Sequence, residues 1–291
     1  AQKILPSVVS VDRYETFERF DMSTVLQETG TGSGVIVSGE GVIVTNNHVV
    51  ANASEVRVRL NDKRTFRAKV LGTDPRSDVA VLKITAENLT PIGIGDSSKV
   101  EVGQWVVAVG NPLGYDGTVS VGVVSSLGRS LVAGGGGEAQ SVLVDAIQTD
   151  AAINAGNSGG ALTDASGNLI GINSAIASNS GGSIGIGFAI PVNDVRRVVE
   201  DILKYGHVRY GSLGVNTVPQ SDAYLSNPRF RSAMQQEFGV EPPQAGLIVR
   251  SVVQGSAAEQ AGVTAYDVLL RVDGIEVTNL LSLTKAMRNK R

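Results

Sequence analysis

The segment Gly156-Asn157-Ser158-Gly159-Gly160 places one serine between glycines. Glycine permits backbone conformations that other residues avoid, so the serine hydroxyl is expected on a tight, uncovered turn. Taken alone, such a segment is more often an ordinary loop, because Gly, Asn and Ser favour turns for local reasons. A serine hydroxyl becomes a useful nucleophile only with a base in hydrogen-bond reach, so the rest of the chain has to supply one.

Two upstream residues suit that task. His48, one of two histidines, lies in Thr45-Asn46-Asn47-His48-Val49-Val50 after an apolar run, and Asp78 precedes the apolar run of residues 79–82. Imidazole has a pKa suited to accepting and returning the serine proton. A buried carboxylate beside it selects the required tautomer and stabilises the imidazolium. We therefore predict that His48, Asp78 and Ser158 form a catalytic triad.

The order of these residues along the chain narrows the fold. His, Asp, Ser is the order of the chymotrypsin-type arrangement and differs from those of subtilisin and the α/β-hydrolases. Asp74 is an alternative acid, but Pro75 follows it and the pair is typical of a turn, so we favour Asp78.

The serine loop also predicts an oxyanion hole. Gly156 allows the chain to turn so that the backbone N–H groups of Gly156 and Ser158 converge on one point, with Asn157 between them. We assign Gly156, Asn157 and Ser158 to this hole.

Short β-branched runs separated by turn residues occupy the chain from residue 30 to residue 190, without a long helical period. This pattern predicts an all-β barrel or sandwich. The expected strands are residues 34–37, 42–45, 56–60, 79–84, 105–109, 119–124, 169–172 and 187–190. Beyond Pro191, apolar residues at helical spacing predict a helix that Asn193 or Asp194 caps and Gly206 ends.

Composition excludes several classes. The 291 residues, 42% of them hydrophobic, suffice for two domains with packed cores. A net charge of −3 gives no electrostatic footprint for nucleic acid. The absence of cysteine rules out thiol catalysis and disulfides. We expect no metal and no cofactor. We also expect no integral membrane segment, because no apolar run approaches the roughly 18 residues of a membrane span. The first residues lack a signal-peptide core, so any export signal is expected to be absent from this chain.

Motifs through nearly the whole chain resemble the HtrA (Deg) family of serine proteases. These motifs are Gly32-Ser33-Gly34-Val35-Ile36-Val37, Thr45-Asn46-Asn47-His48-Val49-Val50, Asp78-Val79-Ala80-Val81-Leu82-Lys83-Ile84, Gly110-Asn111-Pro112, Gln148-Thr149-Asp150-Ala151-Ala152-Ile153-Asn154 and Gly187-Phe188-Ala189-Ile190-Pro191. The resemblance implies a mostly β fold, with a trypsin-like double β-barrel over residues 1–205 and an α+β PDZ-like domain over residues 206–291.

The PDZ resemblance assigns further residues. Ser212, Leu213, Gly214 and Val215 look like the loop that binds a peptide carboxylate, with the next strand accepting the peptide by β-augmentation. Leu283, Ala286 and Met287 would face the groove from the last helix. PDZ modules of the family continue with further strands after this helix, so the domain is expected to be incomplete. Whether a second PDZ domain belongs to the protein is left undecided by the sequence.

A position count suggests the substrate pocket. In trypsin-like enzymes the residue six positions before the nucleophile floors the primary pocket, and here it is Ala152, followed by Ile153. Ile176, on the segment that contains Ser174, is expected to narrow the pocket mouth. We predict a pocket of Ala152, Ile153, Ser174 and Ile176 that takes small or medium aliphatic residues; the alternative is that these residues only pack the barrel.

The resemblance also implies regulation and partners. Arg129 is expected to open a long loop through residues 134–137 and to hold residues near Gly156 in the active arrangement; the alternative is a solvated surface charge. The implied activity is ATP-independent degradation of unfolded or misfolded proteins in protein quality control, by a homotrimer or a larger oligomer of trimers. The implied location is extracytoplasmic, in the bacterial periplasm, with an organelle lumen or the cell envelope as alternatives. A chaperone or PDZ scaffold with little proteolysis is the rival function, which the intact set of His48, Asp78 and Ser158 disfavours.

Overall fold

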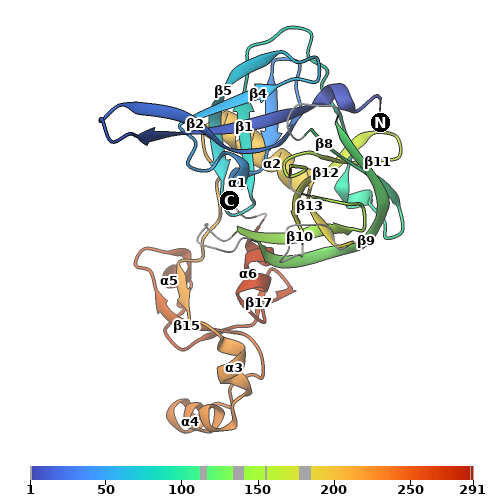
Figure 1. Ribbon diagram of the computed structural model, residues 1–291. Coiled ribbons are helices and arrows are strands. Elements are labelled where there is room, and N and C mark those ends of the chain that lie inside the picture. Colours follow the sequence, from blue (N-terminus) through green and yellow to red (C-terminus); the bar gives the residue numbers. More distant parts are fainter. Residues whose placement is uncertain are drawn as a thin grey trace. The chain divides into compact units, whose positions relative to one another are not determined.

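The computed structural model describes residues 2–111, 117–133, 141–154, 156–176, 185–288 and 290. The side chains of residues 131–133, 141, 142, 175 and 176 lie outside this description. Backbone contacts divide the chain into two compact units, Ala1–Val208 and Arg209–Arg291 (Figure 1).

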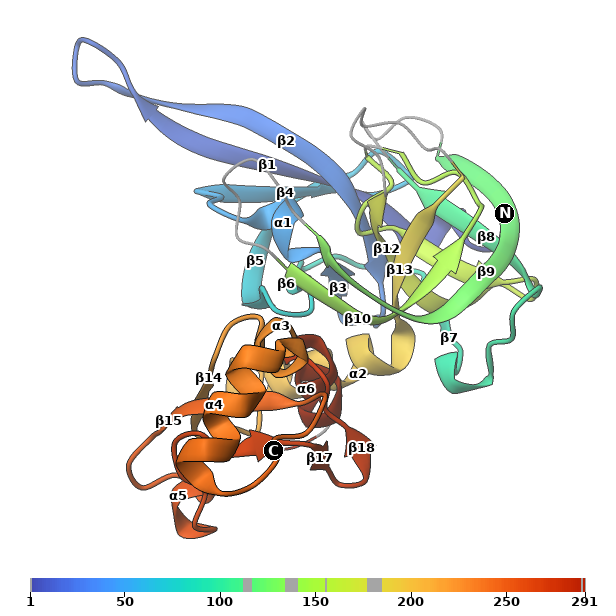
Figure 2. The same cartoon turned by 90° about the horizontal axis from the view of Figure 1, so that it is seen from below.

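The first barrel begins after a short 3-10 turn, η1 (Leu5–Ser7), and closes in the strand order β1-β2-β3-β6-β5-β4. Its strands are β1 (Val8–Glu18), β2 (Thr24–Ile36), β3 (Val42–Thr45), β4 (Glu55–Arg59), β5 (Thr65–Asp74) and β6 (Val79–Lys83). Alternate side chains such as Val9, Ile43 and Leu82 fill its interior. Figure 2 shows β1 and β2 continuing past the barrel as a two-stranded hairpin.

The second barrel has the order β11-β8-β9-β10-β13-β12 and closes through the pairing of β11 with β12. Its strands are β8 (Trp105–Gly110), β9 (Thr118–Ala133), β10 (Ser141–Thr149), β11 (Ala161–Asp164), β12 (Asn168–Ile176) and β13 (Gly187–Pro191). The two-residue strand β7 (Gly93–Ile94) adds to β12 in parallel. The predicted double barrel is therefore confirmed.

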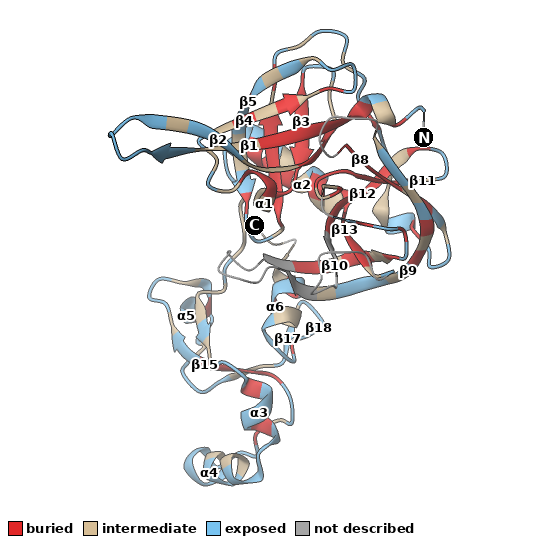
Figure 3. Ribbon diagram, viewed as in Figure 1, coloured by how far each residue is buried: buried red, intermediate tan, exposed pale blue. Residues whose placement is uncertain are grey.

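Buried residues concentrate on the strands of both barrels (Figure 3). One apolar cluster joins them: Val44 and Val81 of the first barrel pack in the same cluster as Leu169 and Ile172 of the second. Because the core is continuous, loops on the two barrels are held in fixed positions relative to each other.

Helix α2 (Val192–Tyr205) closes this unit and buries Val195, Val198 and Ile202 in the shared cluster. The prediction that Gly206 ends the helix is confirmed, since Gly206 adopts φ 77° there. The predicted cap was wrong, because the N-cap position is Pro191, which offers no side-chain acceptor.

Asn193 has another role at the start of α2. Its Nδ2 donates to Asp96 Oδ1 at 2.8 Å, beside the 3-10 turn η2 (Ser97–Lys99). This hydrogen bond, with those from Ser98, lowers the pKa of Asp96 to about 2. The Asp96 carboxylate, which ties the start of α2 to the N-cap of η2, therefore stays ionised throughout the neutral range.

The second unit is small and α+β. Its strands are β14 (Val215–Thr217), β15 (Leu247–Val252), β16 (Val268–Leu269), β17 (Arg271–Val272) and β18 (Ile275–Glu276). Its helices are α3 (Ser221–Ser226), α4 (Pro228–Phe238), α5 (Ala257–Gln260) and α6 (Leu280–Met287). Helices α3 and α4, inserted between β14 and β15, were not predicted from the sequence.

The expectation that Leu283 and Ala286 face a peptide groove needs correction. Both side chains are buried in a core with Leu247 and Val277, and Met287 packs against the same core from a half-buried position. With so few apolar residues available, α6 contributes these side chains to the domain's own core.

No helix in the described ranges combines the length and the apolar character that a membrane crossing requires.

Candidate active site

His48 and Asp78 come together at the end of the first barrel. His48 lies in the one-turn helix α1 (Asn47–Val50), directly after β3, and Asp78 ends the turn before β6. The imidazole Nδ1 is 2.9 Å from Asp78 Oδ2 and 3.0 Å from Oδ1. The Asp78 side chain is 3% exposed and that of His48 is 39% exposed. The ring therefore has one side on a buried carboxylate and another open to a reactant.

The Asp78 backbone and side chain both fix the helix that carries His48. The Asp78 carboxylate accepts the backbone N–H of His48 at 3.0 Å. The backbone carbonyl of Asp78 accepts the Asn46 side-chain amide at 3.0 Å. Asp78 adopts φ 56°, a left-handed conformation that Asp tolerates better than most residues. These contacts hold the ring and the carboxylate in one arrangement before any substrate arrives.

Asp74, the alternative acid, faces elsewhere. Its carboxylate accepts the Ser77 hydroxyl and the Arg76 backbone N–H within its own turn. The described contacts therefore favour Asp78 as the partner of His48.

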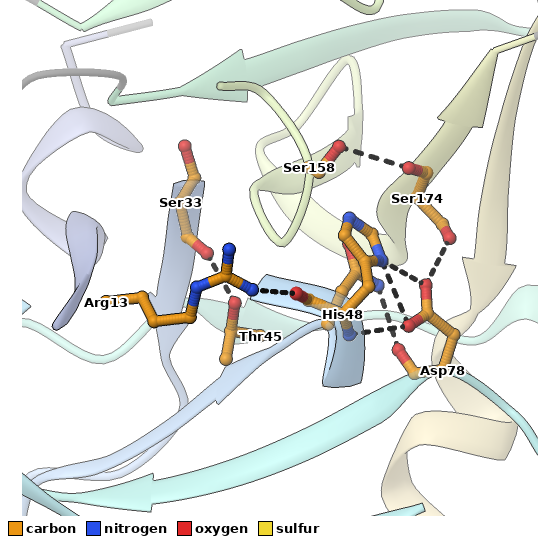
Figure 4. Close-up of polar contacts among 8 residues, drawn as sticks. Arg13, Ser33, Thr45, His48, Asp78, Ser158 and Ser174 are labelled. Atoms are coloured by element: carbon orange, nitrogen blue, oxygen red, sulfur yellow. Dashed lines mark hydrogen bonds and ion pairs between the residues drawn. The ribbon is translucent and has the colours of Figure 1, made fainter. Parts of the chain in front are cut away.

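Ser158 reaches the same place from the second barrel. In Figure 4 the imidazole lies between the Asp78 carboxylate and the Ser158 segment. The Ser158 hydroxyl donates to the Ser174 carbonyl at 3.1 Å, and the Ser174 hydroxyl donates to Asp78 Oδ2 at 2.7 Å. Ser174 was predicted as a pocket residue, but its hydroxyl supports the carboxylate. Sequence reasoning missed this role because the two residues are 96 positions apart.

The loop before Ser158 forms a tight turn. Gly156 adopts φ 94°, where a side chain would be strained. The Asn157 N–H donates to the Asn154 carbonyl at 3.0 Å, so this N–H cannot serve a substrate oxygen in the present geometry. Among the described residues, the N–H groups of Gly156 and Ser158 donate to no protein acceptor. Of the three residues predicted for the oxyanion hole, these two keep a free donor.

The predicted pocket residues differ in position. Ala152 is exposed, and its carbonyl accepts the Ser120 hydroxyl at 2.8 Å. Ile153 is 1% exposed in the core of the second barrel, and a Cβ on Gly187 would lie 2.7 Å from Ile153 Cδ1. Ile153 therefore fills the space beside Gly187. Ile176 ends β12, and its side chain lies outside the described part of the chain.

Arg129 lies within β9 and does not open a loop, so that expectation was wrong. Its Nε donates to Gln148 Oε1 on β10 at 3.1 Å. Arg129 thus contacts Gln148, six positions before Asn154, and no described contact joins Arg129 to Gly156 itself. Residues 134–137, which the expected loop included, lie outside the described residues.

The predicted carboxylate-binding loop of the second unit makes contacts within itself and with the small core of that unit. Gly214 adopts φ 75° and its N–H donates to the Ser212 hydroxyl at 3.2 Å. Leu213 packs against the small core, and Val215 starts β14, which pairs with β15. Within the described residues β14 is an edge strand of this sheet.

No group of three or more His, Asp or Glu side chains is placed in the described ranges to hold an ion. The arrangement of His48, Asp78 and Ser158 instead suits proton transfer and nucleophilic attack.

Comparisons with known sequences match both units. Residues 32–172 match the trypsin-like peptidase domain family and residues 211–291 match the PDZ domain family. The putative serine protease HhoB of a Synechocystis strain is 40% identical over 95% of this chain and 68% of its own length. The periplasmic serine endoprotease DegP of Salmonella typhimurium is 44% identical over 87% of this chain. The chain spans half of the length of DegP.

Solved structures agree with the sequence relatives. The HtrA-type protease AlgW, solved with a decapeptide, superposes with a TM-score of 0.78 at 35% identity, covering 100% of this chain and 89% of AlgW. A serine endoprotease from Yersinia pestis gives a TM-score of 0.71 at 31% identity, covering 100% of this chain and 87% of its own. With both domains, their order and the relatives in agreement, the chain belongs to the HtrA-type family of serine proteases.

Proposed function

We propose that this chain is an endopeptidase in which His48, Asp78 and Ser158 act as a triad. The observation that carries the proposal is the contact of the His48 ring with the buried Asp78 carboxylate, 2.9 Å away, opposite the Ser158 loop. An imidazole in that position has one nitrogen fixed by the acid and the other directed to the side of the nucleophile.

The proposed reaction follows from these contacts. The Ser158 hydroxyl turns from the Ser174 carbonyl to His48, transfers its proton to Nε2 and attacks the substrate carbonyl carbon. Asp78 stabilises the imidazolium, and the N–H groups of Gly156 and Ser158 bind the oxyanion. The imidazolium then protonates the leaving amine, and a water molecule, activated in the same way, releases the acyl group from Ser158.

The experiment that tests this function is casein degradation by the purified chain in buffer without ATP. We expect fragments to accumulate, and we expect prior treatment with a serine-directed fluorophosphonate to prevent it. A chaperone or scaffold would bind unfolded casein and leave it intact, so the same assay distinguishes the endopeptidase from this rival function.

The proposed domains are the protease over residues 1–205 and the PDZ module over residues 206–291.

Cleavage after small or medium aliphatic residues is the expected specificity. Ala152 provides no carboxylate for a basic side chain, and Ile153 fills the space beside Gly187. Enclosing an unpaired ammonium there would cost on the order of several kcal/mol. Peptides with Val or Ala before the scissile bond should therefore be cut far faster than peptides with Lys or Arg.

Mass-spectrometric mapping of casein fragments measures this preference. A matched variant, Ala152→Asp, should gain cuts after Lys and Arg if residue 152 floors the pocket. A majority of cuts after Lys or Arg in the parent chain would contradict the assignment.

Peptide binding at the second unit is proposed from the PDZ match and from the edge strand β14. An extended peptide would add to β14, with its terminal carboxylate at Ser212, Leu213, Gly214 and Val215. The decapeptide in the AlgW structure supports this comparison.

We also propose an extracytoplasmic, periplasmic location, as the name of DegP suggests. We further propose assembly into trimers or trimer-based oligomers, which light scattering would measure.

Arg129 is proposed to favour the active arrangement of the nucleophile loop. Its partner Gln148 lies on β10, which leads directly into that loop. Coupling of this kind typically shifts an equilibrium by about 1–3 kcal/mol. If the active state is the minor one, Arg129→Ala should lower kcat/KM about 5- to 150-fold and leave the cleavage sites unchanged.

Steady-state kinetics on one peptide, together with fragment mapping, test the role of Arg129. Arg67→Ala is the matched control, because Arg67 is a 74% exposed arginine whose ion pair with Glu55 lies on the first barrel. Equal rates for Arg129→Ala and the control would show that Arg129 is a surface charge without a regulatory role.

A further inference from the structure

Ser33 connects the first barrel to the loop that carries the nucleophile. It lies on β2, is fully buried, and belongs to neither the predicted triad nor the predicted oxyanion hole. Its backbone N–H donates to the Ser158 carbonyl at 2.8 Å, and its hydroxyl donates to the Gly156 carbonyl at 2.6 Å. The same hydroxyl accepts the Asn111 N–H at 2.8 Å. One residue thus contacts the loop on both sides of Asn157.

The Ser33 backbone is itself held in place. Its carbonyl accepts the Thr45 hydroxyl at 2.6 Å, a contact drawn in Figure 4. The loop lies directly on this backbone, since a Cβ on Gly159 would be 2.1 Å from the Ser33 carbonyl oxygen and 2.4 Å from Thr45 Oγ1. The position of the loop is therefore set by direct contact with the Ser33 backbone on β2 and with the Thr45 hydroxyl on β3.

These hydrogen bonds fix successive peptide planes. Ser33 holds the Gly156–Asn157 plane through the Gly156 carbonyl and the Ser158–Gly159 plane through the Ser158 carbonyl. The plane between them, which carries the Ser158 N–H, is held by the Gly160 N–H on the Asn157 carbonyl at 2.9 Å. Because a peptide plane is rigid, holding the Asn157 carbonyl fixes the direction of the Ser158 N–H. Holding the Gly156 carbonyl fixes the Asn157 N–H on the same plane, and it restricts the Gly156 N–H only through the backbone angles of Gly156 itself.

Only a hydroxyl satisfies both contacts of the Ser33 side chain. A serine oxygen donates one hydrogen bond while it accepts another, so it can serve the Gly156 carbonyl and the Asn111 N–H together. Alanine would leave both groups without this partner in a buried place. The Gly156–Asn157 plane would keep only the hydrogen bond from the Asn157 N–H to the Asn154 carbonyl and would be held less firmly.

We propose that Ser33 is a positioning residue, whose hydroxyl holds the nucleophile loop so that the N–H groups of Gly156 and Ser158 converge on the oxyanion. This inference rests on the proposed function, because it assigns no chemistry of its own to Ser33. Its effect belongs to the transition state, in which the oxyanion develops, and not to substrate binding.

The test compares Ser33→Ala with the parent chain on a peptide that has Val before the scissile bond. Removing one oxyanion donor typically costs about 100- to 1,000-fold in kcat, so loosening a donor that remains present should cost less, about 10- to 100-fold. KM should stay within about two-fold, because the interaction is made only in the transition state. A peptidyl boronic acid, which forms a tetrahedral adduct with the serine, should lose affinity by the same factor as kcat.

Two further variants make the test specific. Ser10→Ala is the matched control: Ser10 is fully buried, pairs with Ser33 across β1 and β2, and donates its hydroxyl to Asp12. It should change kcat by less than about two-fold, as a substitution away from the site does. Ser33→Cys replaces the hydroxyl by a slightly larger thiol that fills the same place but is a poor donor, so it decides the question if Ser33→Ala does not fold.

The outcomes are distinct. A folded Ser33→Ala or Ser33→Cys chain with parental kcat would overturn the proposal, and so would a kcat loss without a matching loss of boronate affinity. Ser158→Ala, measured beside them, tests the proposed function by itself. If Ser158→Ala abolishes cleavage while the Ser33 variants keep the parental rate, only the positioning role fails.

Discussion

Ser158→Ala is expected to abolish casein cleavage, with a loss of turnover on the order of a million-fold. The hydroxyl is the group that forms the covalent bond to the substrate, so His48 and Asp78 have no nucleophile to activate without it. Stability should barely change, because within the described part of the chain the hydroxyl makes one hydrogen bond, to the Ser174 carbonyl, at a half-buried site.

Gel assays over long incubation and thermal unfolding of the same preparations measure both effects. Ser226→Ala is a matched control, since the Ser226 hydroxyl also donates to a backbone carbonyl, that of Ala223 in the second unit. We expect parental activity from this control. Appreciable proteolysis by purified Ser158→Ala would refute the assignment of the nucleophile.

The second large effect is expected for Asp78→Asn, with a loss of about 10,000-fold in kcat. The asparagine amide would present N–H groups where the carboxylate now accepts from the His48 ring and backbone. The ring would then favour the wrong tautomer, in which the nitrogen on the side of Ser158 carries the proton and cannot accept another.

Asp74→Asn is the matched control for Asp78→Asn. Asp74 is 4% exposed and lies four positions earlier, with its carboxylate on Ser77 and Arg76. Steady-state kcat values of both variants on one peptide decide between the two acids. A larger loss from Asp74→Asn than from Asp78→Asn would show that Asp74 supplies the catalytic carboxylate.

Strands of mostly apolar sequence were predictable from the sequence, and strands that carry several polar side chains were not. The runs at β3 and β6 were found near their observed bounds because nearly every side chain in them is apolar and buried, the pattern of a strand covered on both faces. Strand β1 was missed, since Ser10 and Asp12 alternate with the core residues Val9 and Val11. They are buried on the face opposite the barrel interior, where Arg59 and Thr31 satisfy Asp12. Strand β5 was missed although apolar residues alternate with the exposed Arg67 and Lys69, because a bulge between Val70 and Gly72 interrupts this pattern.

Contacts within the site show a similar limit. The sequence suggested His48, Asp78 and Ser158 because catalysis requires particular residue types in a compatible order. The supporting serines carry no such signal. Ser174 meets Asp78, and Ser33 meets Gly156, only because two barrels close against each other, and the second pair is 123 positions apart. Which hydroxyl meets which carbonyl depends on strand register across that junction, which residue spacing does not encode.

Covalent labelling with a serine-directed fluorophosphonate, located by mass spectrometry of proteolytic peptides, tests the central claim most directly. An activated serine reacts far faster than ordinary surface serines, because it needs a base and oxyanion donors in place. We predict one modification per chain, on Ser158, with strongly slowed labelling in Asp78→Asn and none in Ser158→Ala. Labelling of another serine, or an equal labelling rate in the parent chain and Asp78→Asn, would contradict the account.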